Sequence, residues 1–149
     1  MPSSAAAQSH APAPGTQEAH APLSPAERER YEANYLALFG GASDTARRRW
    51  DVTSRHGRAD VARLIEDVRI KVIHENRLDL KVQQLVHFAQ LLALGKKAAA
   101  EHHAQAALKA GASVEDLLGV VETAFITGGV PAYSIGIEII SEIDAADAK

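Results

Sequence analysis

Two adjacent histidines, His102 and His103, stand in an alanine-rich stretch and carry the side chains best suited to chemistry. An imidazole binds metal ions or transfers protons near neutral pH. Because neighbouring residues on a helix point about 100° apart, this pair cannot chelate one ion together. A metal site would need distant ligands such as His74 or His87. We expect the protein to work without a metal or another cofactor.

His103 shares its helical face with small side chains, namely Ala99, Ala106, Ala107 and Ala110. An imidazole that faces a gap between small residues has a pKa that burial can tune toward acid–base catalysis. The same pattern fits a core histidine that is hydrogen-bonded to a backbone carbonyl or to a neighbouring subunit. Periodicity alone favours this second interpretation.

A second group of polar side chains lies on the preceding helix, predicted over residues 78–94. Its members are Gln83, Gln84, His87 and Gln90, on a different face from an apolar stripe of leucines and Phe88. Such a face lines a pocket or an interface, or it faces solvent. Lys96 and Lys97 follow, and their charge could hold a carboxylate, although lysines at a helix start are usually solvated.

Helices account for every element that the sequence predicts. The Ser-Pro-Ala-Glu run at residues 24–27 has the spacing of a capped helix start, and the Gly-Gly pair at 40–41 ends that helix. Isoleucines four residues apart favour a helix over a strand for the last segment. Further helices are expected over residues 44–55, 60–74, 78–94, 97–110, 113–128 and from Pro131. The prediction is an all-α, compact bundle of six to seven helices.

Two of these helices are expected to be strongly apolar on one face. In residues 60–74 the apolar positions are Val61, Leu64, Ile65, Val68 and Val72. In residues 113–128 they are Val114, Leu117, Leu118, Val121, Ala124 and Phe125. The second helix is the predicted centre of the core.

Length and composition predict one globular domain behind a tail. The chain has 149 residues, of which 46% are hydrophobic, enough to bury a core. Residues 1–23 are rich in Ala, Pro, Ser and Gln and are expected to be disordered, which leaves residues 24–149 as the domain. The net charge of -3 argues against nucleic acid and anionic membranes as partners. No apolar run approaches a membrane span, so we expect a cytoplasmic protein.

Positive charge concentrates locally in the run of Arg47, Arg48 and Arg49. Such a run can bind an acidic ligand. A short run is more often a solvated face or a set of ion pairs, here with the acidic first helix. The ion-pair interpretation is favoured on this ground.

Several short motifs within residues 25–145 resemble those of one known protein family. They are L-K-x-x-x-L-V from Leu80, Ala107 and Gly111 at four and eight residues after His103, Glu115-Asp116, Gly129-Val130-Pro131-Ala132, and at the start Arg30-Tyr31-Glu32 and Leu38-Phe39-Gly40. Together they resemble the carboxymuconolactone decarboxylase family. The resemblance implies the helical fold of alkyl hydroperoxidase D.

The family has two main branches, and the chain departs from both. The alkyl hydroperoxidase D-like branch reduces peroxides through a Glu, a Cys-x-x-Cys pair and a His. The cysteine positions hold Lys96 and Ala99 here, and the glutamate position holds Gln84. Thiol peroxidase activity is excluded because the chain has no cysteine.

The decarboxylase branch has no cysteine requirement and is the nearer of the two. It normally carries an arginine where this chain has Gln83 and an aromatic residue where it has Thr127. Its acidic residue ahead of the histidine is also displaced, since Ala99 stands there and Glu101 follows two residues later.

The resemblance implies a cofactor-independent lyase or isomerase of a small unsaturated lactone or keto acid, in aromatic-compound or secondary metabolism. Loss of CO₂ or a double-bond shift leaves charge on an enolate, which needs a proton donor and electrostatic support. His103 is the expected proton donor or shuttle. The other expected catalytic residues are His87 and Glu101, and the expected substrate-binding residues are Gln83, Gln84, His102 and Lys97.

A non-catalytic ligand-binding or assembly protein that keeps the fold is the alternative. Members of this family usually assemble into trimers or hexamers through helices like these. We therefore expect a homo-oligomer whose pocket, for a small acidic metabolite, lies at or near a subunit interface.

Overall fold

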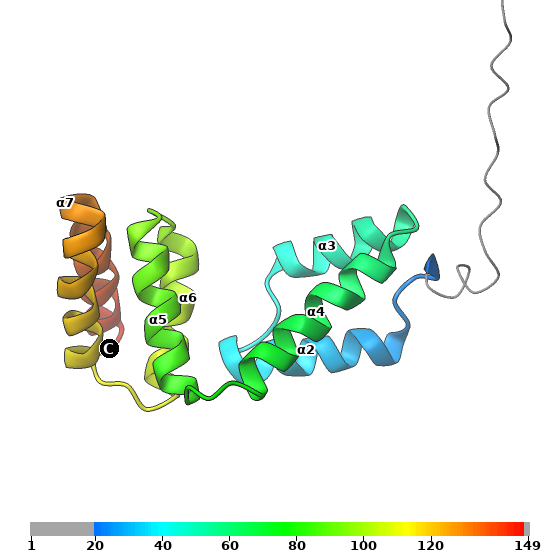
Figure 1. Ribbon diagram of the computed structural model, residues 1–149, viewed down its shortest axis with the longest axis horizontal. Coiled ribbons are helices and arrows are strands. Elements are labelled where there is room, and N and C mark those ends of the chain that lie inside the picture. The colour runs from blue at the N-terminus through cyan, green and yellow to red at the C-terminus, as the bar shows by residue number, and fades with distance from the viewer. Residues whose placement is uncertain (1–19, 148–149) are drawn as a thin grey trace, which may run out of the picture.

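Six helices make up the part of the chain that the computed structural model describes, residues 20–147. They are α2 (Pro25–Phe39), α3 (Asp44–Arg55), α4 (Ala59–His74), α5 (Leu80–Ala93), α6 (Lys97–Lys109) and α7 (Val114–Asp147) (Figure 1). No strand occurs in residues 20–147, so the prediction of an all-α bundle is confirmed. Most of the predicted tail, residues 1–19, lies outside the described residues, and Leu23 is buried.

Local hydrogen bonds explain where the helices begin and end. The Ser24 side chain accepts from the Glu27 amide at 3.2 Å, and the Glu27 carboxylate accepts from the Ser24 amide at 2.7 Å. Ser113 and Asp116 form the same reciprocal pair ahead of α7, at 3.1 Å each. Gly40 ends α2 with φ 83, a left-handed conformation that glycine adopts without strain.

The helices form two groups, each with its own hydrophobic cluster (Figure 1). Residues of α2, α3 and α4 enclose Tyr31, Tyr35 and Trp50, and the ring centroids of Tyr35 and Trp50 are 5.9 Å apart. The two groups meet where α2 contacts α6 and where α4 leads into α5. The second cluster, between α5, α6 and α7, includes Phe88, Leu92, Leu117, Val121 and Ile139.

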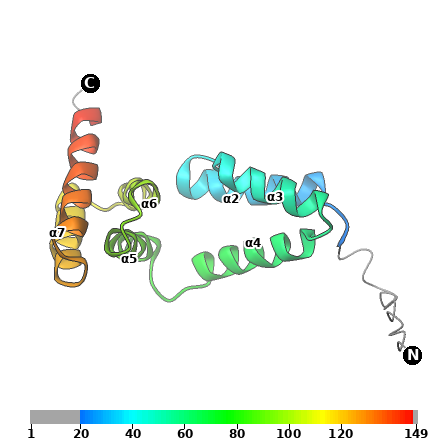
Figure 2. The ribbon, with the colours of Figure 1, turned by 90° about the horizontal axis from the view of Figure 1, so that it is seen from above.

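The last helix, α7, reverses direction at Gly129, whose φ is 67 and ψ is -166. The second arm crosses back over the first (Figure 2). By length and composition the stretch Val114–Ala146 matches a membrane-spanning helix. The reversal divides this stretch into two arms that pack against each other, so it does not form one straight span. The break predicted between a helix over residues 113–128 and a helix from Pro131 is confirmed.

Close packing of the two arms of α7 depends on Gly136. A Cβ atom at this position would lie 2.4 Å from Cγ2 of Val121, far inside van der Waals contact. We expect Gly136→Ala to destabilise the protein by about 1–3 kcal/mol. In the same helix a Cβ at Gly119 meets nothing within 4 Å, so Gly119→Ala should stabilise by about 0.4–1 kcal/mol. Urea unfolding of both variants checks this, and effects of the same sign would contradict it.

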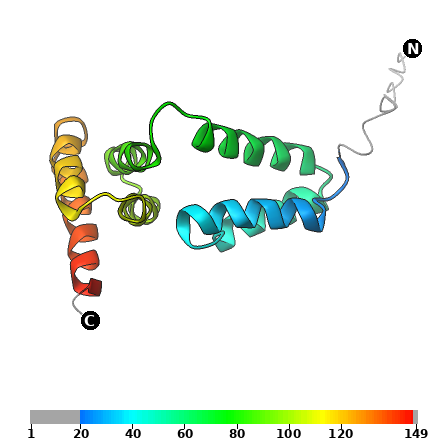
Figure 3. The same cartoon turned by 90° about the horizontal axis from the view of Figure 1, so that it is seen from below.

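Helix α4 is covered by its own chain on one side only. Its buried side chains are Ala59, Ala62, Glu66 and Ile73. Most of the predicted apolar face is between 46% and 65% exposed, namely Leu64, Ile65, Val68 and Val72. Figures 2 and 3 show α2 and α3 along a single side of α4. The apolar period thus predicted the helix correctly, but most of these residues do not pack within the chain.

Candidate functional site

A cavity of about 630 Å³ opens where the two groups of helices meet. Helix α6 contributes His102 and His103 to its wall, with Ala98 and Ala99 beside them. Phe39 and the loop of residues 40–43 form another part of the wall, and the loop side chains are short. The small-residue gap that was predicted beside His103 is therefore present at Ala99, whereas Ala106 and Ala107 are buried in the core.

Contacts on three sides hold the ring of His103. Its Nδ1 lies 2.7 Å from Oε1 of Gln84. Its ring stands edge-on to His87 and Phe39, with centroid distances of 4.7 and 5.3 Å. Because a carboxamide oxygen only accepts, Nδ1 carries the proton and Nε2 of the neutral ring is unprotonated. Gln84 thus selects the tautomer whose Nε2 can take a proton from a bound molecule.

Burial keeps His103 in its neutral form. Burial, followed by the charges of His87, His102 and Arg69, lowers the pKa of His103 from 6.5 to about 4. The pKa of His87 is also lowered, first by burial and then by the charge of Arg69. At pH 7 the His103 ring is a base. It has to accept a proton before it can return one, which suits a proton shuttle better than a first donor.

Two polar atoms behind His103 have no hydrogen-bond partner among the described residues. They are Nε2 of Gln84, whose side chain is fully buried, and Nδ1 of His87. Buried polar atoms are normally paired with protein or with water. This part of α5 therefore retains hydrogen-bonding capacity beyond what holds His103 in place.

The remaining predicted residues divide between the cavity and other surroundings. His102 lines the cavity, and its Nδ1 lies 2.6 Å from the carbonyl oxygen of Ala98. Gln83 is outside the cavity wall, where its Nε2 donates to the carbonyl oxygens of Ile73 and Leu78 at 3.1 and 2.9 Å. This side chain ties the end of α4 to the start of α5.

Lys97 and Glu101 belong to an ion-pair network between α6 and α7. The Nζ of Lys97 is 3.4 Å from Glu101 and 2.8 Å from both Glu138 and Glu142. These side chains are absent from the wall of the main cavity. Among residues 20–147, no three His, Cys, Asp or Glu side chains gather in a way that could hold a metal ion.

The cavity wall and the buried layer behind it contain residues that were not selected from the sequence as site residues. Glu66 of α4 is 1% exposed, and its carboxylate accepts from Nε1 of Trp50 at 2.9 Å and from the Tyr35 hydroxyl at 3.4 Å. Its other oxygen lies 3.3 Å from Nε of Arg69, which lines the cavity. In the sequence, the feature that could have indicated this ion pair is the spacing of Glu66 and Arg69, which are three residues apart. Pairs at this spacing are common on solvated helices, so it is not specific.

Stability should depend on pH through His103. Between the folded pKa of about 4 and the ordinary 6.5, the unfolded state binds the extra proton. Stability is therefore full above pH 6.5 and falls as the pH falls toward 4. From pH 7.5 to pH 5 we expect a loss of about 2 kcal/mol. Urea unfolding at both values checks this, with His103→Gln as the control that should lose about 2 kcal/mol less. Parallel losses in the two proteins would contradict it.

The chain resembles known proteins in sequence and in fold. The model of the carboxymuconolactone decarboxylase family matches residues 59–140, more than half of the chain. An uncharacterized protein of Methanocaldococcus jannaschii is 27% identical over 79 residues, which cover 53% of this chain and 74% of that protein. The crystal structure of a proposed carboxymuconolactone decarboxylase from Burkholderia xenovorans LB400 matches with a TM-score of 0.67 and 18% identity, over 89% of this chain and 96% of that one. At 18% identity, the match to this crystal structure shows the fold alone.

Proposed function

Because the chain belongs to the carboxymuconolactone decarboxylase family, we propose that it is a cofactor-independent lyase or isomerase of a small unsaturated lactone or keto acid. One observation carries this proposal. His103 lines a cavity of about 630 Å³ as a neutral imidazole, and Gln84 fixes its tautomer. A cavity of this size suits a small organic acid.

In the isomerase reaction, Nε2 of His103 takes a proton from a carbon beside the substrate carbonyl. The electron pair of that C–H bond passes into the carbonyl as an enolate, and the imidazolium returns the proton to another carbon of the conjugated system. In the lyase reaction, the bond to the carboxylate breaks, CO₂ leaves, and its electron pair forms the enolate, which then takes up a proton. The neutral state of His103 favours the isomerase reaction, because a base accepts the proton first.

The direct test is to incubate the protein in D₂O with a panel of unsaturated lactone acids and keto acids. Proton NMR follows double-bond shifts and deuterium incorporation, and a coupled assay follows CO₂ release. Deuterium incorporation or product formation with any member supports the proposal. Acids that bind without deuterium exchange, isomerisation or CO₂ release would contradict it.

The second candidate is a non-catalytic ligand-binding protein. It is favoured by the side chains at the positions where this chain departs from the decarboxylase branch. Gln83 holds a turn, and Thr127 donates to the carbonyl oxygen of Ala124 at 3.3 Å. Stabilisation of the protein by an acid from the same panel, without turnover, would identify this function.

We also propose that the protein acts as a homo-oligomer in the cytoplasm. The α4 stripe, defined as Leu64, Ile65, Val68 and Val72, is a row of large exposed apolar side chains on one helix. Soluble monomers seldom leave such a contiguous patch uncovered. A second copy of the chain is the proposed cover, and the pocket would then lie near a subunit interface because Arg69 of the same helix lines the cavity.

A further inference from the structure

Basic side chains dominate the charged part of the cavity wall. Arg47, Arg49 and Arg69 line it together with His102 and His103, and no Asp or Glu of the described residues does. Arg47 is already neutralised, because it pairs with Glu32 of α2 and lies 3.6 Å from Asp44. That pair agrees with the favoured interpretation of the arginine run. Arg49 and Arg69 are not neutralised in this way, because they have only one carboxylate between them.

Arg49 and Arg69 share one buried carboxylate, that of Glu66. Arg69 Nε lies 3.3 Å from Glu66, and Arg49 Nη2 lies 4.0 Å from it. The Glu66 side chain is 2% exposed, against 48% for Arg49 and 32% for Arg69. Two guanidinium groups against one carboxylate leave a net charge of +1. The counter-charge is therefore buried behind the arginines, while the guanidinium groups reach the open space.

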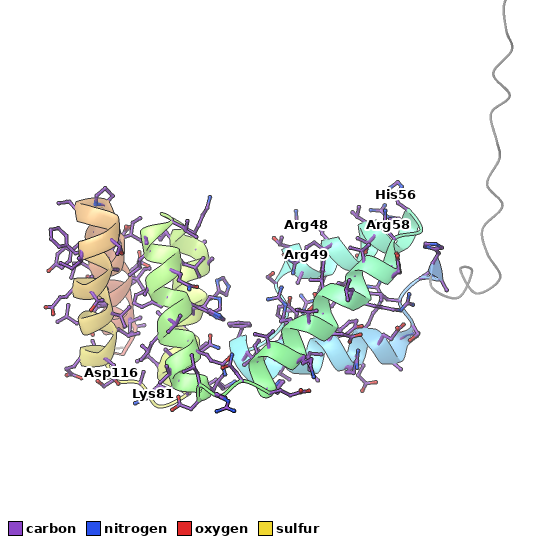
Figure 4. All side chains as sticks on the ribbon, in the orientation of Figure 1. Arg48, Arg49, His56, Arg58, Lys81 and Asp116 are labelled. Carbon is purple, nitrogen blue, oxygen red and sulfur yellow. The ribbon has the colours of Figure 1, made fainter. Side chains whose placement is uncertain are left out.

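Neighbouring side chains hold this pair in place. Arg49 Nη2 donates to the Tyr35 hydroxyl at 3.2 Å, and the Arg69 guanidinium lies 5.4 Å from the centroid of the Tyr35 ring. Figure 4 shows Arg48 and Arg49 on α3, on the part of the helix nearer to α5 and α6. Arg48 is exposed and is not part of the cavity wall. A guanidinium that is already oriented loses less side-chain freedom when it binds an anion.

We propose that Arg49 and Arg69 form a carboxylate-binding subsite in the cavity that His103 lines. The ligand class is a small organic acid whose carboxylate contacts both guanidinium groups. Guanidinium groups match a carboxylate because two N–H groups can donate in parallel to its two oxygens. The other end of the acid then lies among Phe39, Ala99 and His103.

This subsite deepens the proposed function and rests on it for the identity of the substrate. A carboxylate that is ion-paired with two arginines is stabilised as an anion, so it is the group that the reaction retains. A substrate that loses CO₂ must then carry a second carboxylate, whereas an isomerised substrate needs only one.

Binding can be measured without turnover by using the fluorescence of Trp50, the only tryptophan of the chain, which donates to Glu66. The probe is adipate, with dimethyl adipate as its uncharged counterpart and sulfate as an inorganic anion. We expect adipate to bind at least tenfold more tightly than either. Equal affinity for dimethyl adipate, or tighter binding of sulfate, would overturn the proposal.

Variants then locate the binding. Arg49→Gln should weaken adipate binding roughly tenfold or more, since a hydrogen-bonded charge is lost. Arg48→Gln, the same change on the adjacent residue, should alter it less than twofold. Arg69→Gln provides a second variant, and circular dichroism checks the fold of each.

Equal affinities of Arg48→Gln and Arg49→Gln would overturn the subsite. Failure of the proposed function has a different signature, which is intact binding of adipate with no turnover of any acid.

Discussion

Replacing His103 with alanine should lower turnover of the active acid by roughly 10²–10⁴-fold, the usual contribution of a positioned acid–base group. The reason is geometric. His103 lines the cavity with its Nδ1 held 2.7 Å from Oε1 of Gln84, which leaves Nε2 to accept a proton. Alanine also removes the ring contacts with His87 and Phe39, so the fold of the variant has to be checked.

The matched control for this variant is His56→Ala. His56 is exposed, follows the end of α3, and lies far from α5 and α6 (Figure 4). We expect its turnover to stay within about twofold of wild type, because exposed residues outside a site rarely matter. Initial rates with the acid that responds best in the D₂O panel provide the measurement. A folded His103→Ala protein that keeps more than a tenth of the wild-type rate would remove His103 from the mechanism.

The substitution Val68→Asp should convert the assembled protein into monomers of 15.9 kDa. Val68 lies in the middle of the α4 stripe and is 51% exposed in the single chain. If a second copy covers the stripe, the change buries an unpaired carboxylate in an apolar interface, which costs several kcal/mol. Light scattering after size-exclusion chromatography measures the mass of each protein directly.

The control for Val68→Asp is Val52→Asp on α3. Val52 is 47% exposed, so the chemical change and the starting exposure are nearly the same. This variant should keep the wild-type mass. A wild-type protein that is monomeric at micromolar concentration, or a Val68→Asp protein of unchanged mass, would contradict the homo-oligomer.

Local signals in the sequence were sufficient to predict the helices. Caps such as Ser24 with Glu27 depend on residues three apart, and the stop at Gly129 depends on a conformation that favours glycine. These features follow from short-range rules, and the structure has them. The contact between Gln84 and His103 joins two helices. Gln84 was a candidate because it lies on a polar helical face, and His103 because small side chains share its face.

The features that the sequence did not predict depend on packing between residues far apart in the chain. The apolar period of α4 favoured the face with Leu64 and Val68, yet the chain buries the face with Glu66. A buried glutamate is stable there because Trp50, Tyr35 and Arg69 surround it, and these residues come from three different helices. Lys97 depends on distant residues in the same way. Of the three carboxylates next to it, two belong to α7, those of Glu138 and Glu142.

The pH titration of the His103 imidazole by NMR is the most direct test of its role as a neutral base, because it needs no substrate. Protein labelled with ¹⁵N in its histidines gives both the midpoint and the protonated nitrogen. We expect a midpoint near 4 and a proton on Nδ1 at pH 7, held by Gln84. A midpoint near 6.5, or a proton on Nε2 at neutral pH, would contradict the role of His103 as a neutral base.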